Sequence, residues 1–186
     1  WFPVDVSTSS RATIGGMINT DASGQGSCRY GKTRDHVLEL QTVLLDGSVW
    51  NSSAVDDDEL AMIVERPDRV GDIHRAVDKL QKEHADLIEA TFPKLNRCLT
   101  GYDLAHIRTS KGHFDLNSLL CGSEGTLGFI AEAKINLLPI PKCAALVNVN
   151  YEDFNSALRD ATELMRADPT SIETIDSKVL NLAMGD

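Results

Sequence analysis

Two clusters of glycine restrict how this chain of 186 residues can fold more than any other feature. Five of the thirteen glycines fall within 17 residues, where average usage predicts about one. Glycine allows positive φ and lets a ligand approach the main chain closely, and successive N–H groups in such turns bind anions. The pattern predicts two ligand-contacting turns; the alternative is a set of tight turns in a polar loop. The clusters are Gly15, Gly16, Gly24, Gly26 and Gly31, and then Gly122, Gly125 and Gly128.

Charge favours the ligand-binding interpretation for the first cluster. Residues 11–34 carry four basic side chains (Arg11, Arg29, Lys32 and Arg34) against Asp21 alone, within a chain whose net charge is −10. A local basic patch suits a phosphate-bearing ligand, whereas the acidic chain as a whole argues against nucleic acid as a partner. No apolar run approaches the roughly 20 residues that cross a bilayer.

Cysteine and histidine patterns indicate neither a metal site nor a disulfide framework. The four cysteines (Cys28, Cys98, Cys121 and Cys143) contain no C-x-x-C pair, which favours a reducing, cytoplasmic compartment. Histidines that share a helix are more typical of a packed face than of a metal site. We therefore expect no metal site, and no residue of this chain qualifies as a catalytic acid or base.

The chain alternates between strand and helix patterns and predicts an α+β fold. Asp46-Gly47 between two β-prone runs predicts a hairpin, and the acidic residues 56–59 suit the start of a helix. The other expected elements are a helix over about 68–91, strand character over 114–138, a strand over 145–151, a helix over 154–166 and a further strand after Pro169.

Two nucleotide-binding motifs fail in context. Residues 26–33 match the P-loop pattern G-x-x-x-x-G-K-[ST], but no buried strand precedes them and a hairpin strand follows. A Rossmann fingerprint starting at Gly24 would need glycine where Arg29 stands. We therefore expect Lys32→Ala to have little effect on cofactor binding.

The motifs together resemble the FAD-binding domain of the vanillyl-alcohol oxidase/p-cresol methylhydroxylase (PCMH-type) flavoprotein superfamily. The resemblance rests on residues 13–24 with Arg29-Tyr30-Gly31, on Gly101-Tyr102-Asp103-Leu104, and on residues 121–130 followed by Pro139 and Pro141. In spacing the chain is most similar to the FAD-linked D-2-hydroxy acid dehydrogenases that act on D-lactate, glycolate or D-2-hydroxyglutarate.

The resemblance implies FAD as cofactor and assigns it a set of residues. The first segment would lie along FAD, with main-chain amides at its glycines reaching the pyrophosphate and two short polar side chains near the flavin and ribityl groups. The second segment would pass the adenosine half. The residues implied are Thr13, Gly15, Gly16, Asn19, Thr20, Ser23 and Gly24 in the first segment, and Glu124, Gly128 and Ile130 in the second.

The resemblance also implies a domain plan. Residues 1–141 would form the C-terminal part of a PCMH-type FAD-binding subdomain, a mostly antiparallel sheet flanked by helices with a helical insertion at 56–95. Residues 142–186 would begin a ferredoxin-like cap domain. Because the chain starts without Met and lacks the family's earlier pyrophosphate loop, we expect a piece of a longer protein that retains FAD weakly by itself.

The implied activity is hydride transfer from a small 2-hydroxy acid to FAD in the full-length protein. The alternative is a non-catalytic module that binds flavin or another nucleotide. The electron acceptor, a peripheral position at the inner membrane and an iron–sulfur module elsewhere in the protein stay open.

Overall fold

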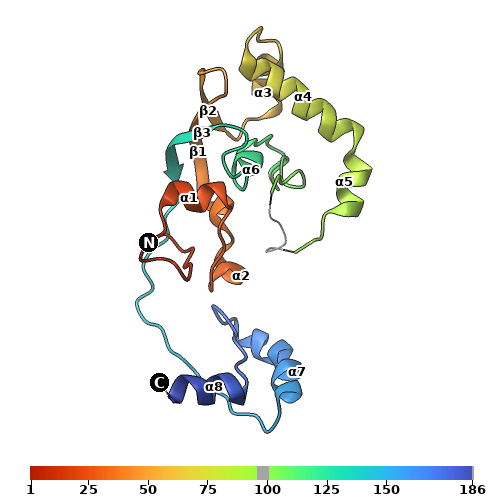
Figure 1. Ribbon diagram of the computed structural model, residues 1–186. Coiled ribbons are helices and arrows are strands. Elements are labelled where there is room, and N and C mark those ends of the chain that lie inside the picture. The colour runs from red at the N-terminus through yellow and green to blue at the C-terminus, as the bar shows by residue number, and fades with distance from the viewer. Residues whose placement is uncertain (96–100, 186) are drawn as a thin grey trace. The chain divides into compact units, whose positions relative to one another are not determined.

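The computed structural model describes residues 1–95 and 101–185, and its contacts divide the chain into two compact units, Trp1–Leu138 and Pro139–Asp186. The first unit contains a three-stranded antiparallel sheet in the order β2-β1-β3, together with short helices (Figure 1). This arrangement is the α+β fold that the sequence predicts. Cys98 lies outside the described residues.

The sheet is built on a hairpin. β1 (Val37–Val43) pairs with β2 (Val49–Ser53) on one side and with β3 (Phe129–Ile135) on the other. Gly47 takes a positive φ of 82° in the turn, and Leu44 N–H donates to the Ser48 carbonyl at 2.9 Å. The prediction from Asp46-Gly47 is confirmed.

One face of the sheet forms the core. Alternate residues of β1 and β2, among them Leu40 and Trp50, are buried against α6 (Asn117–Leu120) and the helices that follow β2. Ser52 Oγ lies 2.6 Å from Asn117 Oδ1, a buried hydrogen bond between the sheet and α6. This contact satisfies two polar groups that would be costly to bury alone.

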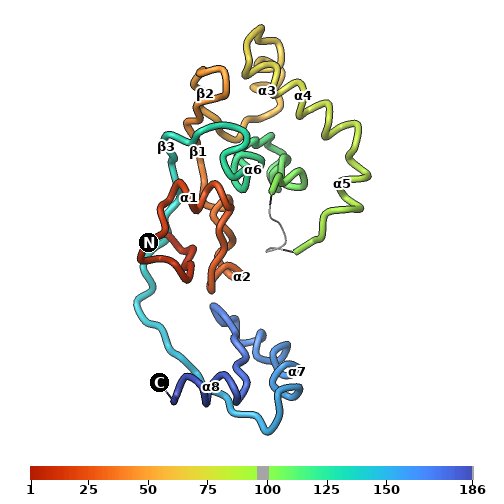
Figure 2. The backbone as a smooth tube through the Cα atoms, viewed as in Figure 1, coloured from red at the N-terminus to blue at the C-terminus, as the bar shows by residue number. Residues whose placement is uncertain are grey.

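The helical insertion consists of three helices. α3 (Asp57–Val64) begins at Asp56, whose carboxylate accepts from Glu59 N–H in a capping box, as the acidic run predicts. α4 (Arg69–Glu83) and α5 (Ala85–Thr91) replace the single helix expected over 68–91, with the break at His84. No residue of α5 is buried, so packing does not hold the two helices in line. Figure 2 shows the tube leaving β2 through α3–α5 and returning to α6 beside β1.

Two segments contain helices that the sequence pattern does not indicate. The polar first 35 residues contain α1 (Ile14–Asn19), α2 (Ser27–Tyr30) and the 3-10 helix η1 (Thr33–His36). Strand character expected over 114–138 is confined to β3, because α6 and glycine turns occupy its first half.

The regular elements in the described part of the second unit are all helices. α7 (Phe154–Leu164) and η2 (Met165–Ala167) confirm the predicted helix, whereas α8 (Ser177–Met184) was not expected. Strands expected over 145–151 and after Pro169 are absent from the described part of this unit. An isolated strand leaves its N–H and C=O groups unpaired, so such segments need neighbouring strands to form. The ferredoxin-like cap stays a prediction.

No helix in residues 1–95 or 101–185 combines the length and the apolar character that crossing a membrane requires. Within the same residues, no three His, Cys, Asp or Glu side chains gather as a metal site would need.

Buried His74 predicts acid-sensitive stability. Its ring lies 5.6 Å from the Trp50 ring and its Nδ1 donates to the Val70 carbonyl at 2.7 Å, and burial lowers the pKa of its imidazole. Below about pH 6.5 the unfolded chain takes up a proton that the folded imidazole resists, so the free energy of unfolding falls as pH falls. Thermal unfolding between about pH 7 and 5 should show a smaller decrease in midpoint for His74→Gln than for wild type. Equal decreases would contradict this assignment.

Candidate functional site

The first glycine segment folds into a capped helical turn. Thr13 is the N-cap of α1, and its Oγ1 accepts from Gly16 N–H at 3.2 Å. At the other end, Ala22 N–H donates to the Met17 carbonyl and Asp21 N–H to the Ile18 carbonyl, at 2.8 and 3.0 Å. These two bonds form a Schellman motif, with Asp21 at the left-handed position that glycine usually takes. The first glycine segment is therefore a short helix that is capped at both ends, rather than a set of tight turns in a polar loop.

The glycines of the predicted site differ in whether the fold itself requires glycine at their positions. A Cβ at Gly24 would lie 1.9 Å from the Asp5 carbonyl oxygen, and one at Gly128 would lie 2.7 Å from Thr42 Cγ2. Both positions are required by packing within the chain. Gly15, in contrast, lies in α1 without a positive φ, and a Cβ there would meet no atom within 4 Å. Because glycine costs about 1 kcal/mol in a helix, Gly15 is the position whose glycine the chain itself does not need.

Some polar groups around α1 have no hydrogen-bond partner within the described part of the chain. Asn19 Nδ2 donates to the Gly15 carbonyl at 2.9 Å, while Asn19 Oδ1 is buried without a hydrogen-bond partner. Thr20 Oγ1 donates to the Gly16 carbonyl at 3.0 Å. The N–H groups of Ile14 and Gly15 have no acceptor inside the helix because they precede its first complete turn. Open space, first-turn donors and an orphaned amide oxygen together fit the polar groups of a dinucleotide such as FAD.

The second glycine segment packs directly against the first. Gly122 N–H donates to the Ile18 carbonyl and Glu124 N–H to the Asn19 carbonyl, both at 2.9 Å. Glu124 is exposed and takes a positive φ of 50°, and a Cβ at Gly125 would meet nothing within 4 Å. The structure thus brings together two segments that are about a hundred residues apart in the sequence.

The remaining predicted residues lie on β3 and directly after the Schellman motif. Ile130 is half-buried on β3 opposite Thr42. Ser23 is half-buried immediately after the Schellman motif. The intermediate sequence element also reaches the site, since Tyr102 Oη lies 2.6 Å from Thr126 Oγ1 in the second segment. All three elements of the resemblance therefore meet in one region.

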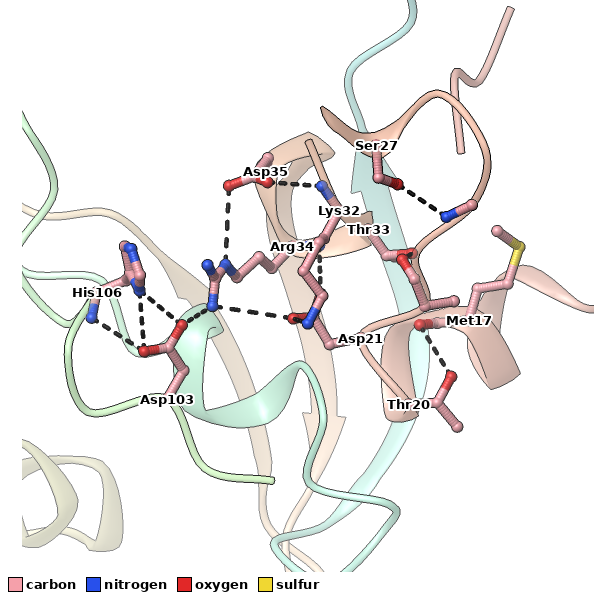
Figure 3. A network of polar contacts seen from close by, with 12 residues as sticks. Met17, Thr20, Asp21, Ser27, Lys32, Thr33, Arg34, Asp35, Asp103 and His106 are labelled. Atoms are coloured by element: carbon pink, nitrogen blue, oxygen red, sulfur yellow. Dashed lines mark hydrogen bonds and ion pairs between the residues drawn. The ribbon is translucent and has the colours of Figure 1, made fainter. Parts of the chain in front are cut away.

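A buried charge network beneath the site was missed by the sequence analysis (Figure 3). Lys32 Nζ lies 2.7 Å from Asp21 Oδ2, and both residues are at most 5% exposed. Arg34 forms an ion pair with Asp103, which is 1% exposed. Two of the four basic side chains assigned to a phosphate ligand are therefore paired with carboxylates inside the chain. Sequence proximity reveals only one of those carboxylates, Asp21, because Asp103 comes from a distant turn.

His106 closes the network on its exposed side. Its Nδ1 donates to Asp103 Oδ2 at 2.7 Å, and Asp103 Oδ1 accepts from Ala105 N–H at 3.0 Å. Burial lowers the pKa of the His106 imidazole, and the nearby Arg34 guanidinium lowers it further. The neutral ring therefore supplies a hydrogen bond to Asp103 rather than a second positive charge.

Comparisons with known proteins point to one cofactor. A family model described as FAD binding domain matches residues 1–53. The chain is 62% identical over 186 residues to a D-2-hydroxyglutarate dehydrogenase of Pseudomonas putida and 48% identical over 187 residues to one of Escherichia coli. Each alignment covers 100% of the chain and 18% of the relative. A glycolate oxidase subunit of Bacillus subtilis is 29% identical over 182 residues, which cover 97% of the chain and 28% of that relative. The chain thus spans about a fifth of the length of the first two relatives.

Proposed function

Because the chain belongs to the family of FAD-linked D-2-hydroxy acid dehydrogenases, we propose that it holds FAD in an enzyme that oxidises a D-2-hydroxy acid. The 62% identity to a D-2-hydroxyglutarate dehydrogenase favours D-2-hydroxyglutarate among the candidate substrates. FAD, when bound, supplies the acceptor for the hydride that leaves the hydroxyl-bearing carbon. The part of the protein in this chain binds and orients the cofactor.

We assign the binding roles as follows. N–H groups at the start of α1, including that of Gly15, face the pyrophosphate, where a negative group is favoured. Asn19 and Thr20 contact the flavin and ribityl groups, and Glu124, Gly128 and Ile130 border the adenosine half. Thr13 and Gly16 hold the first turn of α1 through their mutual hydrogen bond. Ser23 and Gly24 continue the wall of the site beyond Asp21.

The observation that carries this proposal is the junction of the two glycine segments. Two main-chain hydrogen bonds join the end of α1 to residues 122–124, next to the open space at Gly15 and the unpartnered Asn19 Oδ1. A set of unrelated tight turns would not require distant glycine segments to converge on unused polar groups.

The domain plan and location are part of the proposal. Residues 1–141 form the FAD-binding part, with the helical insertion at 56–95, and residues 142–186 begin the cap domain. We propose a cytoplasmic protein, since the cysteine spacing in the sequence suits neither a disulfide framework nor a C-x-x-C pair, as expected in a reducing compartment.

Anaerobic mixing of the full-length protein with D-2-hydroxyglutarate, D-lactate or glycolate tests the proposal. The flavin absorbance should bleach, and D-2-hydroxyglutarate should bleach it at the lowest concentration. Bound FAD that none of the three acids reduces would favour the alternative, a non-catalytic flavin-binding module. A full-length protein that does not bind FAD would refute both.

A further inference from the structure

We propose that Arg34 is a positioning residue for the FAD site, because it ties the first glycine segment to the turn that carries Tyr102 through the carboxylates of Asp21 and Asp103. The inference rests on the proposed function and extends it to residues outside the predicted contacts. Arg34 does not have to touch FAD. Its role is to fix the arrangement in which the two glycine segments accept the cofactor.

The contacts of Arg34 link two parts of the chain. Its main-chain N–H donates to Asp21 Oδ1 at 3.0 Å, and its Nη1 lies 3.9 Å from Asp21 Oδ2. The same guanidinium pairs with Asp103, directly after Tyr102. Figure 3 shows the Arg34 guanidinium between these two carboxylates, with the Lys32 ammonium also at the Asp21 carboxylate. One side chain, 8% exposed, thus joins η1, the end of α1 and the Asp103 turn.

Strain at Asp21 supports a specific need for its carboxylate. Asp21 takes a φ of 44° at the position of the Schellman motif where glycine would be unstrained. A residue other than glycine in this conformation persists only where its surroundings hold it. Here the carboxylate contacts Lys32 Nζ and the N–H of Arg34.

The network is connected to the second glycine segment by close packing. A Cβ at Gly122 would lie 3.0 Å from the Gly101 carbonyl oxygen and 3.3 Å from Asp21 Cβ. A shift of Asp21 or of the Gly101 turn would therefore displace Gly122 and the adjoining Glu124, whose N–H groups bond to α1. Arg34 contacts both Asp21 and the segment that follows Gly101, and therefore holds both groups that pack against Gly122.

Burying these charged groups contributes little net stability to the fold. Removing paired ions from water costs about as much as their attraction returns, and some buried ion networks serve instead to select one arrangement. Arginine suits such a role because its guanidinium presents donors in a rigid plane, whereas the ammonium of lysine is a compact charge on a flexible stem.

Arg34→Lys in the full-length protein tests the proposal against Arg108→Lys. Arg108 is a matched control, since it also joins two carboxylates, with Nη1 2.7 Å from Asp57 Oδ1 and Nη2 3.7 Å from Asp78 Oδ1. Two readouts are measured on protein stripped of FAD: the Kd for added FAD, and hydrogen exchange of the Gly122 and Glu124 amides. We expect Arg34→Lys to raise the Kd about tenfold or more and to speed exchange at both amides, while β1 amides keep their protection. Arg108→Lys should change neither readout.

Other outcomes separate this inference from the proposed function. If wild type binds FAD and Arg34→Lys matches it in Kd and exchange, Arg34 is not a positioning residue. If wild type does not bind FAD, the proposed function itself is wrong. Should Arg34→Lys not fold, Asp21→Asn provides the second variant, because asparagine tolerates positive φ and still accepts from Arg34 N–H. Asp21→Asn should also raise the Kd for FAD, and an unchanged Kd would overturn the proposal.

Discussion

Lys32→Ala should destabilise the first unit by about 3 kcal/mol, because it leaves the Asp21 carboxylate buried without its nearest cation. Lys32 Nζ lies 2.7 Å from Asp21 Oδ2, and the Lys32 side chain is only 4% exposed. Arg34 Nη1, at 3.9 Å, is too far to replace that contact fully. Chemical denaturation followed by circular dichroism measures the loss. A loss of this size would show that Lys32, the lysine of the rejected P-loop pattern, has a structural role.

Two further substitutions show whether charge is responsible. Lys32→Met keeps most of the buried stem and should be nearly as destabilising as Lys32→Ala, since both remove the ammonium group. Lys79→Ala removes a lysine that is 73% exposed and pairs with Glu83 at 3.8 Å, so its effect should stay below about 1 kcal/mol. A Lys32→Met protein as stable as wild type would show that packing, not the ion pair, explains Lys32.

The sequence predicts those elements of this fold whose stabilising interactions lie within a single short segment. Asp46-Gly47 specifies a turn regardless of its surroundings, and Asp56 with Glu59 specifies a helix start, so both predictions are confirmed. The strand expected over 145–151 depends on partners that no local pattern supplies. The break at His84 likewise depends on packing, since the apolar spacing continues to Leu87 but burial does not.

The sequence points to the segments of the candidate site but not to the ion pairs that support them. Glycine spacing marks both segments, local charge favours a ligand at the first, and the structure places the two in contact through Gly122 and Glu124. The charge argument misassigned Lys32 and Arg34. Lys32 pairs with Asp21, the one local carboxylate, and a sequence does not show that the carboxylate of Asp103 lies beside Arg34, some seventy positions earlier. A long-range ion pair leaves no local pattern in the sequence, whereas the glycine turns that it supports are marked by clustered glycines.

The two glycines at opposite ends of the first segment should respond oppositely to substitution. Gly24→Ala places a Cβ 1.9 Å from the Asp5 carbonyl oxygen, a clash with backbone that only a shift of the N-terminal segment can relieve. We expect a loss of about 3 kcal/mol or more in stability without FAD, the upper range for overpacking. Gly15→Leu should leave that stability unchanged or raise it by up to about 1 kcal/mol, since leucine favours helices and its Cβ would meet no atom within 4 Å.

Gly15→Leu, the substitution that leaves stability intact, should weaken the binding of FAD. Helical side chains point back toward the N-terminus, so Leu at position 15 would cover the first-turn N–H groups that we assign to the pyrophosphate. Gly15→Leu in the full-length protein should therefore raise the Kd for FAD by about a hundredfold, equal to losing about 2.7 kcal/mol of binding. Titration of FAD into stripped protein, followed by flavin fluorescence, measures the Kd, and thermal unfolding measures the stability. A Gly15→Leu protein that folds and binds FAD like wild type would remove α1 from the cofactor site, since the chain itself gives no other reason for glycine at this position.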